Sequence, residues 1–462
     1  MAPATTFRSR ALRALTSSIY ARGVLLVGQI GVVPVLATIW GREGYGEWVA
    51  LTAAASYAAY SGLGLAPAIR ADMAMAQVGG GDLAMRPTFQ TAVLFLASLG
   101  ALVLSAVLLA THWAPIAATL NLSVISPSDA VFILRMLTLQ IVLGVVNGAL
   151  LAGLAASGRL AFANTLDASR QALEFLAVAA AVWLLRVSPR TIAELYAASA
   201  GLFFLLEFTI LARVAPAVVG GPWRGDLAVL RRIWRPTLGT LALNFGYNGL
   251  MVQAPRVIIA STAGPAAVAS YTACVMLLRI VRIPLEIPGV SLTVEISKAF
   301  AAGDLPFVRR LLNLSTRGAF WLSILALPLV VLLGPWIVHV WSNGRLTGDP
   351  AILLILSLST CAYAAGLPSL EALTSVNRLL AVSIWLLVLA APFLLLCNLA
   401  SAHFGLAGMA SSVTILEVAV AVVCLVHASG IFRINLGSGL AMFTPPGPAA
   451  WLALRSRHPA VR

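Results

Sequence analysis

Charged residues are scarce in this sequence, and long stretches contain none at all. Asp, Glu, Lys and Arg make up only 10% of the 462 residues, against about 25% in a typical soluble domain. Four runs without any of these residues are 48–69, 87–128, 318–344 and 379–416. Each is long enough for one or more membrane spans, because a transmembrane helix takes about 20 apolar residues. We therefore expect an all-α polytopic membrane protein and exclude a soluble one.

Cysteine and lysine are also rare, and the motifs of common enzymes are missing. The four cysteines lie within apolar stretches without close spacing, which indicates buried thiols rather than a disulfide or a metal site. The single lysine, Lys298, follows no glycine-rich loop, so the phosphate-binding motif GxxxxGK[ST] is absent. The sequence also contains no Gly-x-Ser-x-Gly and no His-Glu-x-x-His motif. We expect no cofactor, no metal and no enzymatic activity.

Hydropathy predicts twelve membrane spans in two groups of six. The first group covers approximately 18–40, 47–68, 88–110, 129–153, 162–185 and 192–214. The second group covers 237–260, 266–293, 316–341, 351–372, 379–400 and 405–428. We accordingly expect a basic N-terminus at 1–17, six-helix lobes at 18–215 and 237–428, a linker at 216–236 and a basic tail at 429–462.

The basic residues predict the orientation of these spans. With the N-terminus inside, the cytoplasmic segments hold 20 Lys and Arg residues, the opposite side holds 4, and 6 lie within spans, which accounts for all 30. Short loops rich in Lys and Arg face the cytoplasm. We therefore expect both termini on the cytoplasmic side of a bacterial inner membrane. Because the basic residues are scattered between apolar runs, topology explains the net charge of +14 without a nucleic-acid partner.

A short tripeptide recurs at equivalent places in the two groups of spans. Gly-Asp-Leu occurs at 81–83, after the second span, and again 222 residues later at 303–305, after the eighth span. A third copy at 225–227 precedes the seventh span. The glycine is expected to end one helix and the aspartate to cap the next. The matching positions indicate an internal duplication of a six-span unit, which is common in transporters.

Several longer motifs lie near these tripeptides. Arg22 opens a span that contains Gln29 and Pro34. The motifs of the first half are WGREGYGEW at 40–48, YSGLGLAPAI at 60–69 and GGGDL at 79–83. Those of the second half are AGPAAVASYTACVMLLR at 263–279 and EISKAFAAGDL at 295–305. Together they resemble the Wzx-type polysaccharide biosynthesis flippases. These proteins belong to the multidrug/oligosaccharidyl-lipid/polysaccharide exporter superfamily, which also includes the multidrug-and-toxin exporters and the lipid II flippases.

The resemblance implies a fold, a substrate and partners. It implies about twelve transmembrane helices in two six-helix lobes around a central cavity, lined mainly by the first, second, seventh and eighth helices. It also implies alternating access, with a polyprenyl-pyrophosphate-linked oligosaccharide as the substrate, such as an O-antigen, capsule or exopolysaccharide unit. The implied partners are this lipid-linked oligosaccharide, membrane lipids, and the polysaccharide polymerase and chain-length machinery.

The eighth span carries three charged residues on one face of the expected helix. Arg279, Arg282 and Glu286 stand at positions i, i+3 and i+7. One carboxylate cannot neutralise two guanidinium groups, so this face is expected to be cationic and to bind the substrate pyrophosphate through the arginine fork. Glu286 is the first candidate for proton coupling. The alternative is that these residues only pair with acids on neighbouring helices, such as Glu207 or Glu417.

Four further residues are candidates for substrate binding. Arg22 lies near the cytoplasmic end of the first span, where it either contacts substrate or anchors the helix at the membrane surface. Asn244 and Asn248 lie one turn apart in the seventh span and suit sugar hydroxyls, although hydrogen bonding between helices is the alternative. Arg256, near the outer end of that span, either binds substrate or is an interfacial residue.

Three other charged residues within a span are expected to be structural. Asp167, Arg170 and Glu174 stand three and four residues apart in the fifth span, so they can neutralise one another. Two alternative functions remain. An ion-coupled drug or cation exporter of the same superfamily should have an acidic cavity, and a membrane-embedded glycan polymerase should have a large periplasmic loop. No extracytoplasmic loop is expected to exceed about 20 residues, so the polymerase is the less favoured alternative.

Overall fold

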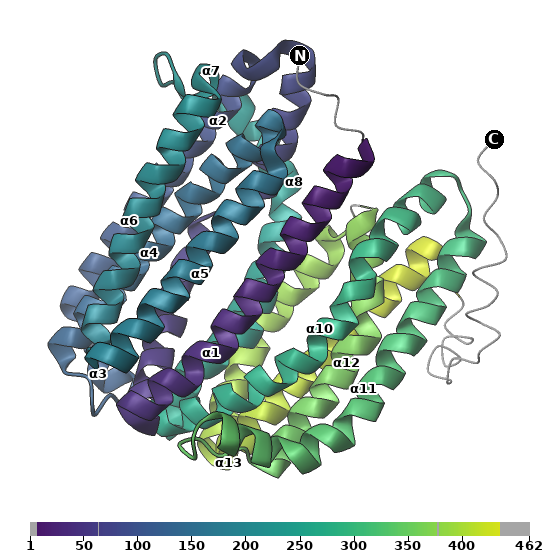
Figure 1. The fold of residues 1–462 in the computed structure, drawn as a ribbon. Coiled ribbons are helices and arrows are strands. Elements are labelled where there is room, and N and C mark those ends of the chain that lie inside the picture. The colour runs from purple at the N-terminus through teal and green to yellow at the C-terminus, as the bar shows by residue number, and fades with distance from the viewer. Residues whose placement is uncertain (1–6, 63, 377, 435–462) are drawn as a thin grey trace. The chain divides into compact units, whose positions relative to one another are not determined.

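The computed structural model describes residues 7–62, 64–376 and 378–434. Every regular element within these residues is a helix, which confirms the prediction of an all-α protein (Figure 1). Most of the predicted basic N-terminus, residues 1–17, falls within the described helices, whereas most of the predicted tail, 429–462, lies outside the described residues. The chain forms two compact units, and the seventh predicted span, 237–260, is divided between them.

The first unit comprises Met1–Phe245 and Gly264–Val268. Its helices are α1 Phe7–Ser56, η1 Tyr57–Gly62, α2 Leu65–Trp113, α3 Ile116–Thr119, α4 Pro127–Leu154, η2 Ala155–Arg159, α5 Leu160–Leu185, α6 Pro189–Val214, α7 Pro216–Val219 and α8 Leu227–Asn244. Helix α4 packs against α2 and α6, and α1 packs along α5 (Figure 1). The shorter helices α7 and α8 both pack against α2.

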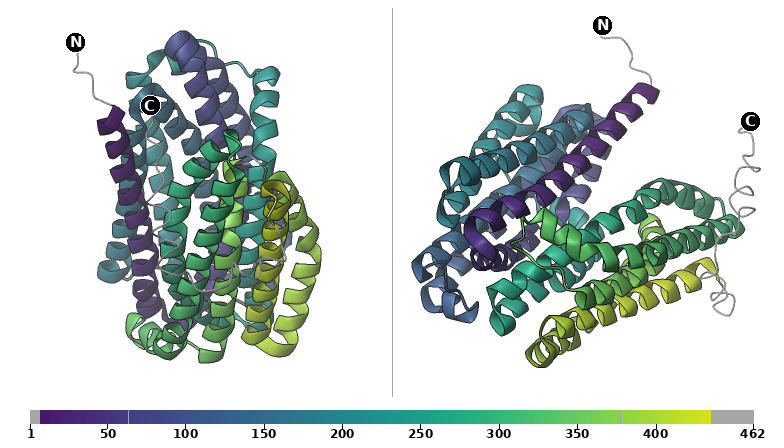
Figure 2. Two further views of the ribbon diagram at one scale, coloured as in Figure 1. Left: turned by 90° about the vertical axis from the view of Figure 1, so that its right-hand side faces the viewer. Right: turned by 60° about the horizontal axis from the view of Figure 1, so that its bottom comes forward.

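The second unit comprises Gly246–Ala263 and Ala269–Arg462. Its helices are η3 Phe245–Gln253, α9 Ala254–Ala263, α10 Pro265–Ala301, α11 Leu305–Trp341, α12 Pro350–Ser375 and α13 Leu380–Phe432, where η3 and α10 begin in the first unit. Helix α12 packs between α11 and α13, and Figure 2 shows these three helices side by side. The element η3 is a π-helical segment of 9 residues that joins α8 to α9.

Glycines interrupt the longest helices between neighbouring predicted spans. Gly41 (φ 72°, ψ 178°) lies between the first two predicted spans in α1, and Gly405 (φ 58°, ψ −138°) lies where the last of them begins in α13. Gly158 (φ 79°) similarly separates α4 from α5. A positive φ is accessible to glycine at little cost and strains other residues. Each glycine therefore lets the chain change direction between two membrane spans.

Seven helical segments in the described residues are long and apolar enough to cross a membrane. Two of them, Pro127–Leu185 and Leu380–Phe432, contain 59 and 53 residues, and about 20 residues suffice for one crossing. Each therefore accounts for two predicted spans. The remaining predicted spans, 18–40, 47–68 and 237–260, are not among these seven segments. The prediction of a multi-pass membrane protein is confirmed.

Two of the three Gly-Asp-Leu tripeptides cap helices as predicted. The Asp226 carboxylate accepts the backbone N–H of Ala228 at 2.7 Å at the start of α8. The Asp304 carboxylate accepts the backbone N–H of Phe307 at 3.0 Å at the start of α11. At the first copy, Gly81 has a positive φ of 66°, as predicted for a glycine that ends a helix. The capping prediction is wrong for Asp82, which lies inside α2 and accepts a hydrogen bond from the side chain of Gln77.

The motif WGREGYGEW has a structural role in the first unit. Glu47 is fully buried, and its carboxylate accepts the backbone N–H groups of Ser123, Val124 and Ile125 at 2.5, 2.7 and 2.6 Å. Backbone donors in a turn are costly to bury without a partner. One buried carboxylate thus fixes the turn that leads into α4.

The predicted orientation is tested by reporter fusions. A reporter placed after Gly81, Gly225, Gly303 or the C-terminus is expected to remain in the cytoplasm, because the segments rich in arginine stay on that side. Active alkaline phosphatase reports the periplasm, and fluorescent GFP reports the cytoplasm. A fusion after Gly344, in the predicted periplasmic loop between α11 and α12, is the control with the opposite expected result. Phosphatase activity at any of the four cytoplasmic sites contradicts the predicted topology.

Candidate functional site

The three charged residues predicted for the eighth span lie on α10 in the second unit, but they have different surroundings. Arg279 is exposed and has no hydrogen bond or ion pair with any residue that the structure describes. Arg282 is largely buried, with 22% of its side chain exposed, and Glu286 is partly buried. The helical spacing therefore places one arginine on the surface and the other inside the unit.

Arg282 is held by hydroxyl groups of two neighbouring elements. Its Nη1 donates to the hydroxyl of Tyr247 in η3 at 3.1 Å. Its Nε donates to Thr360 and its Nη2 to Ser359, both in α12, each at 3.3 Å. The guanidinium also lies over the ring of Tyr363 at 4.6 Å from the centroid, a favourable cation–π position. These contacts fix the guanidinium in a single position against α12.

Glu417 on α13 supplies the negative charge beside Arg282. Its side chain is 3% exposed, and its Oε1 lies 3.9 Å from Nη1 of Arg282. The Tyr247 hydroxyl donates to the same carboxylate at 3.2 Å. The predicted uncompensated cationic face is therefore wrong for Arg282, because Glu417 comes from a helix that the local sequence does not reveal. It holds for Arg279, and the pairing with Glu417 proposed as the alternative is present.

Glu286 joins the same network through a tyrosine. The hydroxyl of Tyr363 donates to Oε1 of Glu286 at 3.0 Å, and its ring lies 6.1 Å from that of Tyr247. Two carboxylates thus surround one guanidinium, which can balance only one of them. A role of Glu286 in proton coupling stays a prediction.

The network is too tightly packed to hold a sugar in the arrangement described. A cavity of about 10 Å³ lies beside Tyr247, Tyr363 and Glu417, and a single water needs about 10–15 Å³. A substrate phosphate could reach Arg282 only after this packing opens. The exposed Arg279 meets no such barrier.

The other predicted site residues lie elsewhere or are only partly described. Arg22 lies in α1, and its side chain is outside the described residues. Asn244 is the last residue of α8 in the first unit, and Asn248 is exposed within η3 in the second. Arg256 is half-buried in α9, where its Nη1 donates to Gln253 one turn earlier at 3.1 Å. Roles of these four residues in substrate binding stay predictions.

The three charged residues of α5 form the predicted structural cluster. Arg170 Nη2 lies 2.9 Å from Asp167, and Nη1 lies 3.0 Å from Glu174, so one guanidinium is paired with both carboxylates, as predicted. Ser199 of α6 also donates to Glu174 at 2.9 Å. This prediction is confirmed. It succeeded because all three residues belong to two successive turns of one helix.

Sequence reasoning missed two tyrosines of the buried network and the surroundings of two acids. Tyr247 and Tyr363 were not considered, and Glu417 and Glu207 were considered only as packing partners. The available signal was the presence of hydroxyl and carboxyl groups inside apolar spans, where polar side chains seek partners. Glu207 on α6 of the first unit is fully buried, and neither carboxylate oxygen has a hydrogen-bond partner within the described residues.

Comparison with known proteins identifies the fold. No protein-family model and no curated protein matches the sequence. The inward-facing structure of a multidrug resistance MATE family transporter of the MOP superfamily matches with a TM-score of 0.70 at 13% identity, covering 90% of this chain and 99% of that one. MATE in a bent conformation matches with a TM-score of 0.62 at 14% identity, covering 95% of this chain and 97% of that one.

A third similar structure has a binding pocket of reverse polarity. A MOP superfamily transporter from Pyrococcus furiosus matches with a TM-score of 0.61 at 13% identity, covering 92% of this chain and 96% of that one. The reverse polarity of its binding pocket suggests a different function for that protein. At such low identity these similarities show a shared fold alone. The chain therefore has the two-lobed fold of MATE transporters, in agreement with the predicted fold class.

Proposed function

We propose that this chain is a transporter that flips a polyprenyl-pyrophosphate-linked oligosaccharide across the bacterial inner membrane by alternating access. The substrate moves from the cytoplasmic to the periplasmic leaflet. The fold of MATE transporters supports a transport function. The resemblance of the motifs at 40–48, 60–69 and 295–305 to Wzx-type flippases supports the lipid-linked oligosaccharide.

Arg279 is the observation that carries the choice of an anionic substrate. Its guanidinium is exposed and lacks an acidic partner among the described residues, although it lies in the membrane-spanning segment Pro265–Glu286. An unpaired charge at such a position costs about 3 kcal/mol or more. A pyrophosphate would remove this cost, because the planar guanidinium binds phosphate oxygens through two parallel hydrogen bonds.

Arg282 has a conditional role in this proposal. While it is paired with Glu417 it has no free donor pair directed at a ligand. Protonation of Glu417 would weaken its attachment to α13 and make it available as a second phosphate contact. Arg279 is then the first contact with substrate, and the predicted polar residue Asn248 of the same unit contributes to sugar binding.

An ion-coupled exporter of drugs or cations is the second candidate function. The observation that favours it is Glu207, whose buried carboxyl group has no hydrogen-bond partner among the residues that the structure describes. A buried carboxylate suits a transported cation or a coupling proton. A multidrug resistance MATE family transporter also shares this fold.

Deletion of the gene in its native bacterium distinguishes the two candidates. We expect lipid-linked oligosaccharide to accumulate in the cytoplasmic leaflet and surface polysaccharide to disappear, with unchanged sensitivity to cationic drugs. Surface polysaccharide is measured by gel electrophoresis and drug sensitivity by growth inhibition, and a plasmid copy restores the natural phenotype in the control. Normal surface polysaccharide together with increased drug sensitivity contradicts the flippase and favours the exporter.

Proton coupling is tested at Glu286. Glu286→Gln is expected to abolish the dependence of transport on a pH gradient, because glutamine keeps the hydrogen bond from Tyr363 but cannot exchange a proton. Transport into proteoliposomes is measured with and without an imposed gradient. Glu43→Gln removes an exposed carboxylate outside the network and serves as the matched control. Gradient-driven transport that persists unchanged in Glu286→Gln assigns Glu286 a purely structural role.

A further inference from the structure

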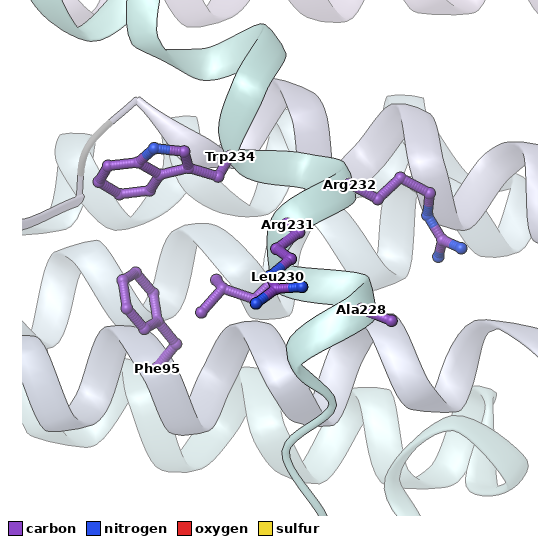
Figure 3. Close-up of a pocket in the computed structure, with 6 residues that line it drawn as sticks. All are labelled: Phe95, Ala228, Leu230, Arg231, Arg232 and Trp234. Atoms are coloured by element: carbon purple, nitrogen blue, oxygen red, sulfur yellow. The ribbon is translucent and has the colours of Figure 1, made fainter.

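A second region rich in arginine lies in the first unit, where α8 packs against α2. A cavity of about 840 Å³ is lined by Phe95 of α2 and by Ala228, Leu230, Arg231, Arg232 and Trp234 of α8 (Figure 3). This volume falls within the roughly 300–1,000 Å³ that small-molecule ligands occupy. The cavity combines guanidinium groups with aromatic rings, and the transport site proposed above uses none of these residues.

One of the two arginines fixes α8 in place. Nε of Arg232 lies 2.6 Å from Oδ1 of Asp72 on α2, and its Nη2 donates to Oδ2 of the same carboxylate at 2.7 Å. Thr88 donates to this carboxylate as well, at 2.6 Å. The buried Ile233 packs into the hydrophobic core of the unit. Helix α8 is therefore anchored to α2, and Nε and Nη2 of Arg232 are engaged in this anchor.

The other arginine and the tryptophan have free donors. Arg231 is exposed and forms no hydrogen bond or ion pair with the described residues. Trp234 packs edge-to-face on Phe95, with ring centroids 6.4 Å apart at 90°. The indole N–H has no acceptor among the residues described. Figure 3 shows Trp234 and Phe95 on the same side of α8, with Arg232 directed away from them. A cation and a neutral donor thus line one cavity beside two aromatic rings.

The position of these residues along the chain matches a membrane surface. Arg231 and Trp234 come just before the seventh predicted span, 237–260, and Phe95 lies about two helical turns inside the third, 88–110. The segment that contains Arg231 belongs to the side with most of the basic residues. Tryptophan is enriched at the level of lipid headgroups, and basic pockets between helices on the cytoplasmic side suit anionic headgroups.

We propose that this cavity binds one anionic glycerophospholipid of the cytoplasmic leaflet. Arg231 holds the phosphodiester through its forked N–H groups, and the indole N–H of Trp234 donates to an ester carbonyl. Phe95 and Leu230 contact the glycerol-proximal carbons of an acyl chain. A free phosphate would leave the apolar surfaces of Phe95, Leu230 and Trp234 in this cavity uncovered, so the observations favour a lipid.

Lipid binding to the purified full chain tests this proposal. Native mass spectrometry in detergent is expected to show stronger binding of phosphatidylglycerol than of phosphatidylcholine. Arg231→Ala should weaken phosphatidylglycerol binding about tenfold, because one charge-assisted contact is lost. Arg231→Lys should retain some of the preference, since the charge remains without the fork. Arg159→Ala removes an exposed arginine of the same unit on the same predicted face and should leave binding unchanged.

Folding and the nature of the ligand are checked separately. Thermal unfolding without added lipid should be the same for Arg231→Ala and the natural chain, because Arg231 contacts no described partner. Trp234→Phe keeps a ring against Phe95 and should lower binding severalfold by removing the N–H donor. Equal binding of the two lipids overturns the proposal, as does an equal loss in Arg159→Ala. Displacement of the lipid by millimolar inorganic phosphate would instead identify a phosphate site and also overturn it.

Discussion

Arg282→Ala is expected to destabilise the second unit by about 3–5 kcal/mol, the typical cost of leaving one member of a buried ion pair alone. Glu417 is 3% exposed and would keep only the Tyr247 hydroxyl as a described donor. The hydroxyl groups of Ser359 and Thr360 would lose a donor as well. Thermal unfolding of the purified chain in detergent, followed by size-exclusion chromatography after heating, measures the effect.

A double substitution separates this loss from a simple loss of volume. Arg282→Met combined with Glu417→Leu replaces the pair with apolar side chains of similar size and should restore most of the stability, because no unpaired charge remains. Arg279→Ala is the matched control and should leave stability unchanged, since Arg279 contacts no described partner. Equal stability of Arg282→Ala and the natural chain would show that the pair contributes nothing to folding.

The membrane spans and the helical cluster of α5 could be predicted because both depend on residues close together in the chain. A span is a run of apolar residues, and Asp167, Arg170 and Glu174 meet within two turns. The breaks at Gly41 and Gly405 fell at or beside predicted span boundaries for the same reason. A glycine beside a short polar segment is a local sequence signal that the chain can change direction there.

The buried network could be predicted only in part because its members come from four separate helical elements. Glu417 and Glu207 were both possible partners, and nothing in the sequence near Arg282 indicates that Glu417 is the one beside it. The helical period places Arg279 and Arg282 about 60° apart around the helix, so sequence analysis assigns both residues to one face. That angle is large enough to bring Arg282 against α12 and leave Arg279 exposed. Which member of such a pair is buried depends on the rotation of the helix against its neighbours.

Substitutions at Arg279 are expected to have the largest effect on transport without affecting stability. Arg279→Ala removes one charge-assisted contact with the pyrophosphate, worth about 1.5–3 kcal/mol, or roughly ten- to a hundredfold in affinity. Arg279→Lys should rescue only a fraction of this loss, because an ammonium group keeps the charge but not the bidentate geometry. Arg279→Glu should be the most severe, since a carboxylate repels the phosphate. Export of surface polysaccharide is measured in cells at matched membrane levels of each variant.

A control variant, together with export and unfolding temperature measured for each variant, identifies the role of Arg279. Arg345→Ala removes another exposed arginine, in the loop between α11 and α12, and should export normally. If Arg279 contacts the substrate, export should decrease in the order Arg, Lys, Ala, Glu at this position, and the unfolding temperature should stay the same in all four proteins. A structural role predicts that export and unfolding temperature fall together. Normal export by Arg279→Glu would show that the phosphate binds elsewhere. If Arg279→Glu extrudes cationic drugs better than the natural chain, the cation exporter is favoured, because the substitution makes the site acidic.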